Sequence, residues 1–153
     1  MADGSRRWPQ NVSGDFFVDR TCIDCDQCRE IAPGTFGDAP GHASVYRQPD
    51  SPELERRALL ALVTCPVGSI GAGQRHNLNT AVEAFPEPIE DNVYFCGFAS
   101  ADSFGASSYL IVQPEGNVLS RKSNLDTVEG VSGNGVENRT MCLLPESCEK
   151  VPR

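Results

Sequence analysis

Four cysteines constrain this chain more than any other feature. Three of them stand in C-I-D-C-D-Q-C, residues 22–28, and Cys65 follows much later, directly before Pro66. Two-residue gaps let one tight loop direct three thiolates toward a common centre, but sterics keep the same loop from supplying a fourth. A distant cysteine completes the set, and the proline after it restricts the direction of the chain. The spacing therefore predicts that Cys65 folds back beside the loop.

This set of four thiolates is typical of an iron–sulfur cube, and it resembles the motif of single-cluster ferredoxins. Two-cluster bacterial ferredoxins use C-x₂-C-x₂-C-x₃-C-P, and the last cysteine of each motif binds the other cluster. Ala32 stands where the first motif would have its fourth cysteine. In the second motif the first three positions hold Glu55, Ala58 and Ala61. The pattern therefore predicts one [4Fe–4S] cluster. Its predicted iron ligands are Cys22, Cys25, Cys28 and Cys65.

A structural zinc site is the alternative for four thiolates. Zinc sites usually take two separated C-x₂-C pairs. This chain instead has three closely spaced cysteines and a lone Cys-Pro, which favours the cluster. A bound metal group also explains how a small, loop-rich core can fold, because ligand binding contributes directly to the folding free energy.

Charge and cysteine usage narrow the class of protein further. The chain has 153 residues and a formal net charge of −8, which argues against nucleic acid as a partner. It has no apolar stretch long enough to cross a bilayer, and residues 1–10 lack the apolar core of a secretory signal. We therefore expect a soluble, intracellular protein in a reducing compartment. Its seven cysteines then suit metal binding better than disulfides.

Local patterns predict an α+β, ferredoxin-like domain over residues 12–74. Residues 15–19 have the composition of a strand that leads into the cysteine loop, and residues 42–47 alternate as a second strand does. The expected architecture is two short helices packed on a small antiparallel sheet. The apolar cover of the cluster is expected to come from Ile23, Ile31, Phe36, Val67 and Ile70.

Two helices are expected in this domain. Residues 27–32 predict a short helix that Pro33 and Gly34 end. Ser51 stands where an N-cap belongs, before a proline and two glutamates, and an apolar stripe follows. This second helix should end near Thr64, because the proline after Cys65 cannot continue it.

The remainder of the chain has weaker patterns. Residues 93–97 and 109–113 predict a pair of short strands. The expected pieces are a flexible N-terminus at 1–11, the [4Fe–4S] domain at 12–74, a linker at 75–92, a β fragment at 93–119 and a disordered tail at 120–153.

Two longer strings resemble a fusion family in which an N-terminal ferredoxin domain precedes a metallo-β-lactamase-fold hydrolase. They are N-V-S-G-D-F-F-V-D-R-T-C-I-D-C, from residue 11, and Y-F-C-G-F-A-S-A-D-S-F-G-A-S-S-Y-L-I-V-Q-P-E-G-N-V-L, from residue 94. The resemblance implies that residues 93–119 are a remnant of the opening strands of the hydrolase. Members occur in cyanobacteria and photosynthetic eukaryotes, which implies the cytoplasm or, in such a eukaryote, the plastid stroma.

After Leu119 the resemblance stops. The family continues toward an H-x-H-x-D-H motif, which holds a dinuclear metal centre that activates water. This chain has two histidines, His42 and His76, and both precede the hydrolase segment. We therefore expect no hydrolase activity. A changed frame or splice pattern, a short isoform and an incomplete gene sequence would each explain the break.

One-electron transfer to and from redox partner proteins is the function that these residues predict. The alternative is a redox, structural or sensing cluster module of a metallo-β-lactamase-fold hydrolase, here without the metal site of the hydrolase. Asp24 and Asp26 are expected to be solvated, and their charge would lower the reduction potential. Neither histidine stands in a ligand pattern, so both are expected at the surface or in turns. Cys96 is expected to be a small buried hydrophobe, and no role is expected for Cys142, Cys148 or Trp8.

Overall fold

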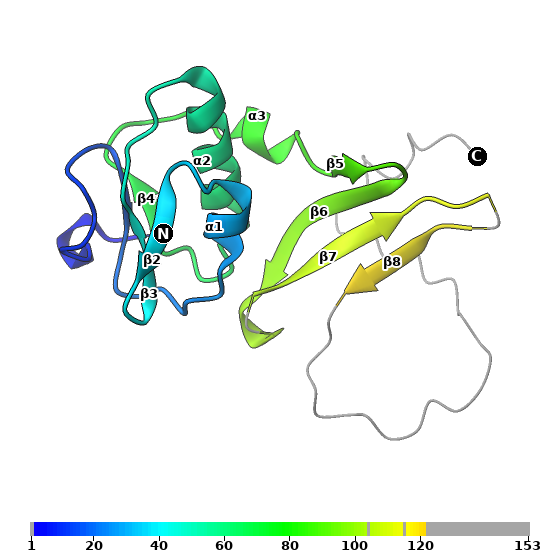
Figure 1. Ribbon diagram of the computed structural model, residues 1–153, viewed down its shortest axis with the longest axis horizontal. Helices are drawn as coiled ribbons and strands as arrows, with labels where there is room; N and C mark the ends of the chain where they lie inside the picture. Colours follow the sequence, from blue (N-terminus) through cyan, green and yellow to red (C-terminus); the bar gives the residue numbers. More distant parts are fainter. Residues whose placement is uncertain (1, 104, 115, 122–153) are drawn as a thin grey trace.

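The computed structural model describes residues 2–103, 105–114 and 116–121 (Figure 1). Its helices and strands confirm the predicted α+β class. In chain order they are the 3₁₀ helix η1 (Gly4–Arg6), β1 (Phe16–Val18), α1 (Gln27–Ile31), β2 (Phe36–Ala39), β3 (His42–Val45), α2 (Pro52–Thr64), β4 (Ile70–Ala72), α3 (Asn79–Val82), β5 (Glu87–Glu90), β6 (Val93–Ser100), the 3₁₀ helix η2 (Ala101–Ser103), β7 (Ala106–Ile111) and β8 (Val118–Arg121).

The strands pair in three antiparallel sheets. β1 pairs with β4, β2 pairs with β3, and β5, β6, β7 and β8 form one four-stranded sheet in that order. Figure 1 shows the two small sheets with α1 and α2 on one side of the molecule and the four-stranded sheet on the other. The small sheet that the sequence predicts is therefore two separate ladders.

Two side-chain amides explain why β1 and β3 do not join into one sheet. Asn11 donates to the Val18 carbonyl at 2.8 Å and accepts from the Val18 amide at 3.0 Å. Gln48 makes the same pair of bonds to Phe16, both at 2.9 Å. The Asn11 Oδ1 atom also accepts from the Val45 amide of β3 at 3.0 Å. These amides stand where the backbone of a paired strand would lie.

The N-terminal residues, expected to be flexible, are bonded to the domain. Arg7 forms an isolated antiparallel bridge with Asp19, and the Trp8 amide donates to the Val18 carbonyl at 3.0 Å. The Trp8 ring stacks on His42 with centroids 4.0 Å apart, and it packs against the core. Trp8 therefore has a structural role that its position in the sequence did not indicate.

α2 forms for the reasons that its sequence suggests. The Ser51 hydroxyl accepts a hydrogen bond from the Leu54 amide at 3.3 Å. Pro52 lies in the first turn, where backbone amides have no partner within the helix, so the missing N–H of proline costs nothing. The buried face of α2 packs against α1, α3, β4 and β6, and the helix shares one apolar core with both small sheets. The large buried side chains of this core are Phe16, Val18, Ile31, Phe36, Val45, Leu59, Leu60, Ile70 and Phe95.

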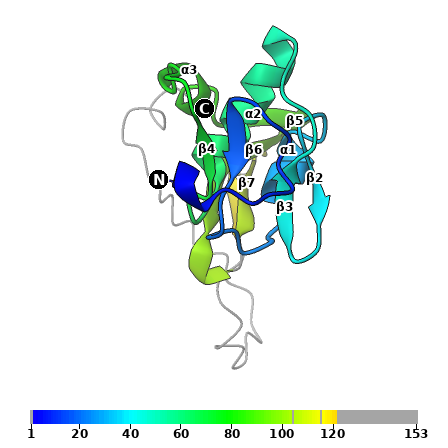
Figure 2. The same ribbon diagram turned by 90° about the vertical axis from the view of Figure 1, so that its left-hand side faces the viewer.

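Residues 75–92, expected to be a linker, contain α3 and β5. Phe95 of β6 belongs to the same buried core as α2, so the four-stranded sheet is docked on the cysteine domain. Figure 2 shows β6 and β7 passing behind α2 and β4. Glu87 of β5 reinforces this contact through ion pairs with Arg56 at 2.9 Å and Arg57 at 3.5 Å.

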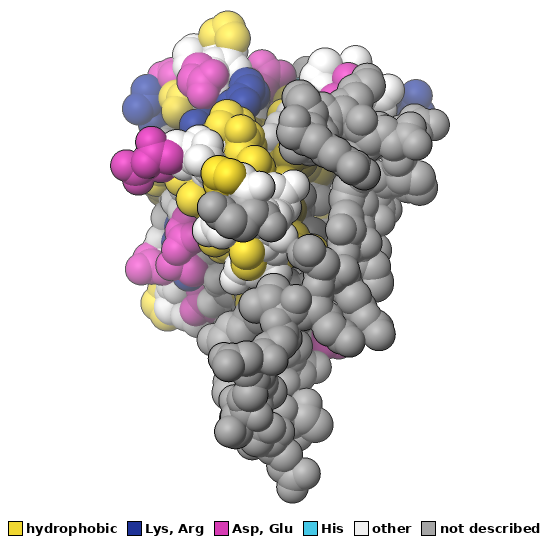
Figure 3. Space-filling model, turned by 90° about the vertical axis from the view of Figure 1, so that its right-hand side faces the viewer, with side chains coloured by type: hydrophobic (Ala, Val, Ile, Leu, Met, Phe, Trp, Pro, Cys, Tyr) yellow, Lys and Arg dark blue, Asp and Glu magenta, His cyan; other side chains and the backbone are white. Residues whose placement is uncertain are grey.

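The expected pair of strands is present and longer than the patterns indicate. β6 and β7 continue to a tight connection at η2, and β8 adds a third strand that no pattern predicted. The disordered tail was predicted at 120–153. Only Ser120 and Arg121 of this range are described, and they are the last residues of β8; the prediction for 122–153 lies outside the described residues. Among the described residues, no helix is long and apolar enough to span a membrane. Figure 3, viewed from the β8 side, shows hydrophobic side chains gathered in the middle of this face and charged ones at its edge.

Candidate iron–sulfur site

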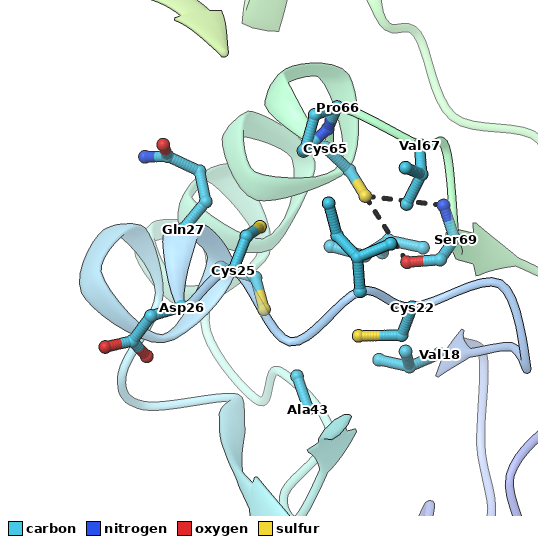
Figure 4. Close-up of a pocket in the computed structure, with 13 residues that line it drawn as sticks. Val18, Cys22, Cys25, Asp26, Gln27, Ala43, Cys65, Pro66, Val67 and Ser69 are labelled. Carbon is cyan, nitrogen blue, oxygen red and sulfur yellow. Dashed lines mark hydrogen bonds between the residues drawn. The ribbon is translucent and has the colours of Figure 1, made fainter. Parts of the chain in front are cut away.

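The four predicted cysteines line one pocket. Cys22 and Cys25 lie in the loop between β1 and α1, and Cys28 lies in the first turn of α1. Cys65 is the residue directly after α2. In Figure 4, Cys22, Cys25 and Cys65 surround a common space, and Cys28 lines the same pocket. The structure thus brings both cysteine segments together as their spacing predicts, and their role as ligands stays a prediction.

Two left-handed residues shape the cysteine loop. Asp24 and Asp26 have φ angles of 56° and 70°. Aspartate enters this region more readily than most residues, because its short polar side chain bonds to nearby groups. Each left-handed residue turns the chain between two successive cysteines. This allows Cys25 and Cys28 to face the pocket that Cys22 lines.

The end of α2 positions the fourth cysteine. The Thr64 hydroxyl donates to the Leu60 carbonyl at 2.9 Å and closes the last turn. Cys65 then leaves the helix in an extended conformation, with ψ at 115°. Pro66 enforces this exit, because a residue before proline avoids the helical region. Cys65 therefore points away from the helix axis and into the pocket (Figure 4).

Hydrogen bonds reach the sulfur atoms of Cys22 and Cys65. The Asp24 amide donates to Cys22 Sγ at 3.4 Å, and the Ser69 amide donates to Cys65 Sγ at 3.3 Å. The Ser69 hydroxyl also lies 3.3 Å from Cys65 Sγ. Such donors stabilise a negatively charged sulfur and tune a bound metal group. No sequence pattern predicted Ser69, whose only signal is its place four residues after Cys65.

Apolar side chains form much of the remaining wall. Ile23, Val67 and Ile70 line the pocket, as the sequence predicts. Val18 and Ala43 add to this wall and were not predicted to do so. Ile31 and Phe36 are buried in the core but are not among the lining residues. These walls limit the access of water to the cysteines.

The Cys25 and Cys28 thiols are unfavourable places for negative charge in the absence of a bound cation. Burial, together with the neighbouring Cys22 and Cys65, raises the pKa of Cys28 to about 12. Burial also raises the pKa of Cys25. A metal centre reverses this preference, because coordination displaces the thiol proton outright. Four partly buried thiols in one pocket therefore suit a positively charged metal group.

The arrangement of the sulfur atoms bears on which metal group fits. Within the described residues, no three His, Cys, Asp or Glu side chains converge closely enough to hold a single metal ion. A cube places each thiolate on a different iron, so its ligands surround a larger space than the ligands of one zinc ion do. The structure places the four cysteines around one pocket, and the choice of metal group stays a prediction.

The loop carboxylates are paired, which corrects the expectation that they are simply solvated. Arg29 forms ion pairs with Asp24 at 2.8 Å, with Asp38 at 2.7 Å and with Asp26. Burial lowers the pKa of Arg29, but hydrogen bonds to Asp26 and Asp24 outweigh this effect and raise it. Arg29 therefore stays charged and offsets part of the negative charge beside the cysteines.

The other candidate residues lie outside the pocket. His42 is buried, with Nδ1 3.0 Å from the Pro40 carbonyl, so its expected surface position is wrong. His76 lies between two carboxylates, Asp15 at 2.6 Å and Glu55 at 3.1 Å, that the sequence spacing did not reveal. Cys96 is half-buried in β6, and burial raises its pKa. The remaining expectations concern Cys142 and Cys148, which lie outside the described residues.

The comparisons with known proteins agree with this geometry. Residues 18–72 match the family model of the 4Fe-4S single cluster domain of Ferredoxin I, and this stretch contains all four pocket cysteines. No curated protein and no solved structure matches the chain. The family match ends at β4, so the resemblance to a hydrolase fusion is supported by the sequence strings alone. Residues 18–72 are therefore similar to a single-cluster iron–sulfur domain of the ferredoxin type.

Proposed function

We propose that this chain carries single electrons between partner proteins by means of one [4Fe–4S] cluster. The observation that carries this proposal is the shared pocket, into which two distant segments bring four cysteines and little else that is polar. A [4Fe–4S] cluster supplies a centre that gains and loses one electron. The proposed ligands are Cys22, Cys25, Cys28 and Cys65.

The residues around the pocket have distinct parts in this proposal. The amides of Asp24 and Ser69 hold sulfur atoms in place and offset their negative charge. Val18, Ile23 and Ile70 exclude water from the inner side. Rigid ligands in a dry pocket need little rearrangement when the charge of the site changes by one.

The polar side of the cysteine loop is the proposed approach for a redox partner. Asp26 and Asp38 are more than half exposed, and Arg29 joins them to Asp24. These groups are net negative, so they favour a partner with a basic surface. Gln27, which follows Asp26 in the chain, is buried and does not take part in this polar side. The proposed location remains a reducing, intracellular compartment.

Anaerobic reconstitution tests the cluster and its ligands. We expect about four irons and four sulfides per chain, and a paramagnetic signal on one-electron reduction. Replacing any of the four cysteines with serine should lower the iron content by at least about half, because three thiolates hold the cube poorly. Cys96→Ser is the matched control, since Cys96 does not line the pocket, and it should retain the cluster. Stoichiometric zinc without sulfide would contradict the proposal.

Voltammetry separates electron transfer from the alternative role. One reversible one-electron wave, repeated over many cycles, would support a carrier. A cluster that is lost on each reduction would instead favour a structural or sensing module, the role proposed for the domain within a metallo-β-lactamase-fold hydrolase.

A further inference from the structure

Gly105 brings the four-stranded sheet into contact with the cysteine pocket. Gly105 is buried, lies directly before β7, and donates its amide to the Ser100 carbonyl at 2.7 Å. A Cβ atom added there would lie 2.8 Å from Cys25 Sγ and 2.5 Å from Cys25 Cβ. The backbone of Gly105 therefore lies directly against a proposed ligand, and no side chain fits between them.

Ser107 holds the same segment against α1. Its hydroxyl donates a hydrogen bond to the Oε1 atom of Gln27. Gln27 is only 5% exposed, lies between two of the cysteines in the sequence and lines the pocket. A buried amide that loses its partner is costly, so this bond resists separation of the sheet from the loop.

Contacts farther from the pocket hold the sheet in the same position. Phe95 is buried in the core that α2 and the small sheets form. Glu87 pairs with Arg56 and Arg57 on the outer side of α2. Gly105 and Ser107 are thus the part of the docked sheet that lies nearest the pocket. The contacts of Phe95 and Glu87 help to hold them there.

We propose that residues 105–107 form a cover over the Cys25 side of the cluster site and control access of solvent and small molecules to it. This inference takes the cluster from the proposed function, but it does not require reversible electron transfer. Residues far outside the ferredoxin-type stretch thereby determine the exposure of its metal group.

Three single substitutions separate the cover from general effects on the fold. Gly105→Ala places a methyl group against Cys25. Gly41→Ala is the matched control, because Gly41 has the same φ of +77° but nothing within 4 Å of the added carbon. Ser107→Ala removes only the bond to Gln27 and adds no bulk.

The first measurement is the rate at which the reconstituted chain loses iron to a chelator. We expect Gly105→Ala to lose iron about tenfold faster, because a strain of roughly 1.4 kcal/mol on the closed form changes an opening equilibrium by that factor. Ser107→Ala should be roughly three- to tenfold faster, as the loss of one hydrogen bond predicts. Gly41→Ala should match the unchanged chain.

The second measurement needs no cluster. Alkylation of the metal-free chain by iodoacetamide, followed by mass spectrometry, reports the accessibility of Cys25. Gly105→Ala and Ser107→Ala should speed alkylation of Cys25 and leave that of Cys96 unchanged. If Gly105→Ala does not fold by circular dichroism, Ser107→Ala decides the question.

Equal rates of iron loss and of Cys25 alkylation in Ser107→Ala, Gly41→Ala and the unchanged chain would overturn the cover. If these rates are equal but the voltammetric wave is reversible, the chain is an electron carrier without a cover. If the two variants Gly105→Ala and Ser107→Ala lose iron faster but reduction is irreversible, the cover is supported and the electron-carrier proposal is contradicted.

Discussion

Arg29 lies between three carboxylates beside the cysteine loop, and it changes the electrostatics of the site. The pairing with Asp24 and Asp26 joins both left-handed residues of the loop to α1. One guanidinium can do this because its donors form a rigid fork. The arginine therefore stabilises the loop and reduces the negative charge near the cysteines.

Replacing Arg29 tests this electrostatic role. Arg29→Gln leaves Asp24 and Asp26 unbalanced, so adding an electron becomes harder. We expect the reduction potential to fall by an amount on the order of tens of millivolts. Voltammetry measures the shift, and Arg29→Lys, which keeps the charge, should restore most of it. An unchanged or higher potential in Arg29→Gln would show that the arginine charge does not act on the cluster.

At the scale of residues, the sequence predicted which cysteines share a pocket but not what surrounds them. The cysteine spacing reports chemistry directly, because few other structures need three thiolates two residues apart. Ser69 and Gly105 have no such signal. Their importance arises from where α2 and the sheet end in space, which single-residue patterns do not contain.

α2 connects folding to the site, since it packs the core with one face and delivers Cys65 from its last turn. Its start and end were predicted from Ser51, Pro52 and Pro66, which act through local sterics and hydrogen bonds. The burial of Leu60 then fixes where this last turn lies relative to β1 and β4.

Shortening Leu60 tests how far the core supports the site. Leu60→Ala should lower the free energy of unfolding by about 2–5 kcal/mol, because it leaves a cavity in a fully buried position. Urea unfolding followed by circular dichroism measures the change. Leu78→Ala is the control, since Leu78 is 38% exposed, and it should cost far less. Similar losses in the two variants would contradict this account of the core.

The strands of the four-stranded sheet were only partly predictable. Val93 and Tyr109 begin or continue apolar runs, so β6 and β7 were expected. β5 contains a proline and two glutamates, and it follows a proline, so its composition indicates a loop. It forms a strand because Glu87 and Pro88 pair with β6 and Arg56 anchors Glu87, which are tertiary effects.

At the scale of the whole molecule, charges distant in sequence meet across the domain. His76 lies between Asp15, before β1, and Glu55, in α2. The two ring nitrogens of His76 therefore join the segment before β1 to α2. The contacts of His76 with Asp15 and Glu55 hold the segment after β4 against the domain. Nothing in the local sequence indicated these contacts.

Acid should weaken the contact between Asp15 and His76. Burial raises the pKa of Asp15, but the bonds from His76 and the Gln74 amide outweigh it and hold the pKa below its ordinary 3.8. A carboxyl with a lowered pKa stabilises the fold above its unfolded pKa, and the effect is lost as the pH falls through the folded value. We therefore expect the free energy of unfolding to fall below about pH 4.

Asp15→Asn isolates this contribution. The substitution should cost about 1–3 kcal/mol near pH 7, where hydrogen bonds to an ionised carboxylate are lost, and should flatten the decline in acid. Urea unfolding at several pH values measures both effects. Asp102→Asn, at an exposed position, removes one charge as a control and should keep the steep decline. An equally steep decline in Asp15→Asn would assign the acid sensitivity to other carboxyls.

The amides of Asn11 and Gln48 have a consequence for how copies of this chain behave toward one another. An unpaired strand edge is a template on which another chain can add a strand and begin to aggregate. On β1 the backbone groups of Phe16 and Val18 that do not face β4 are already bonded to these side chains. Intermolecular strand addition there would first have to displace both amides, so the protein protects this edge without a further strand.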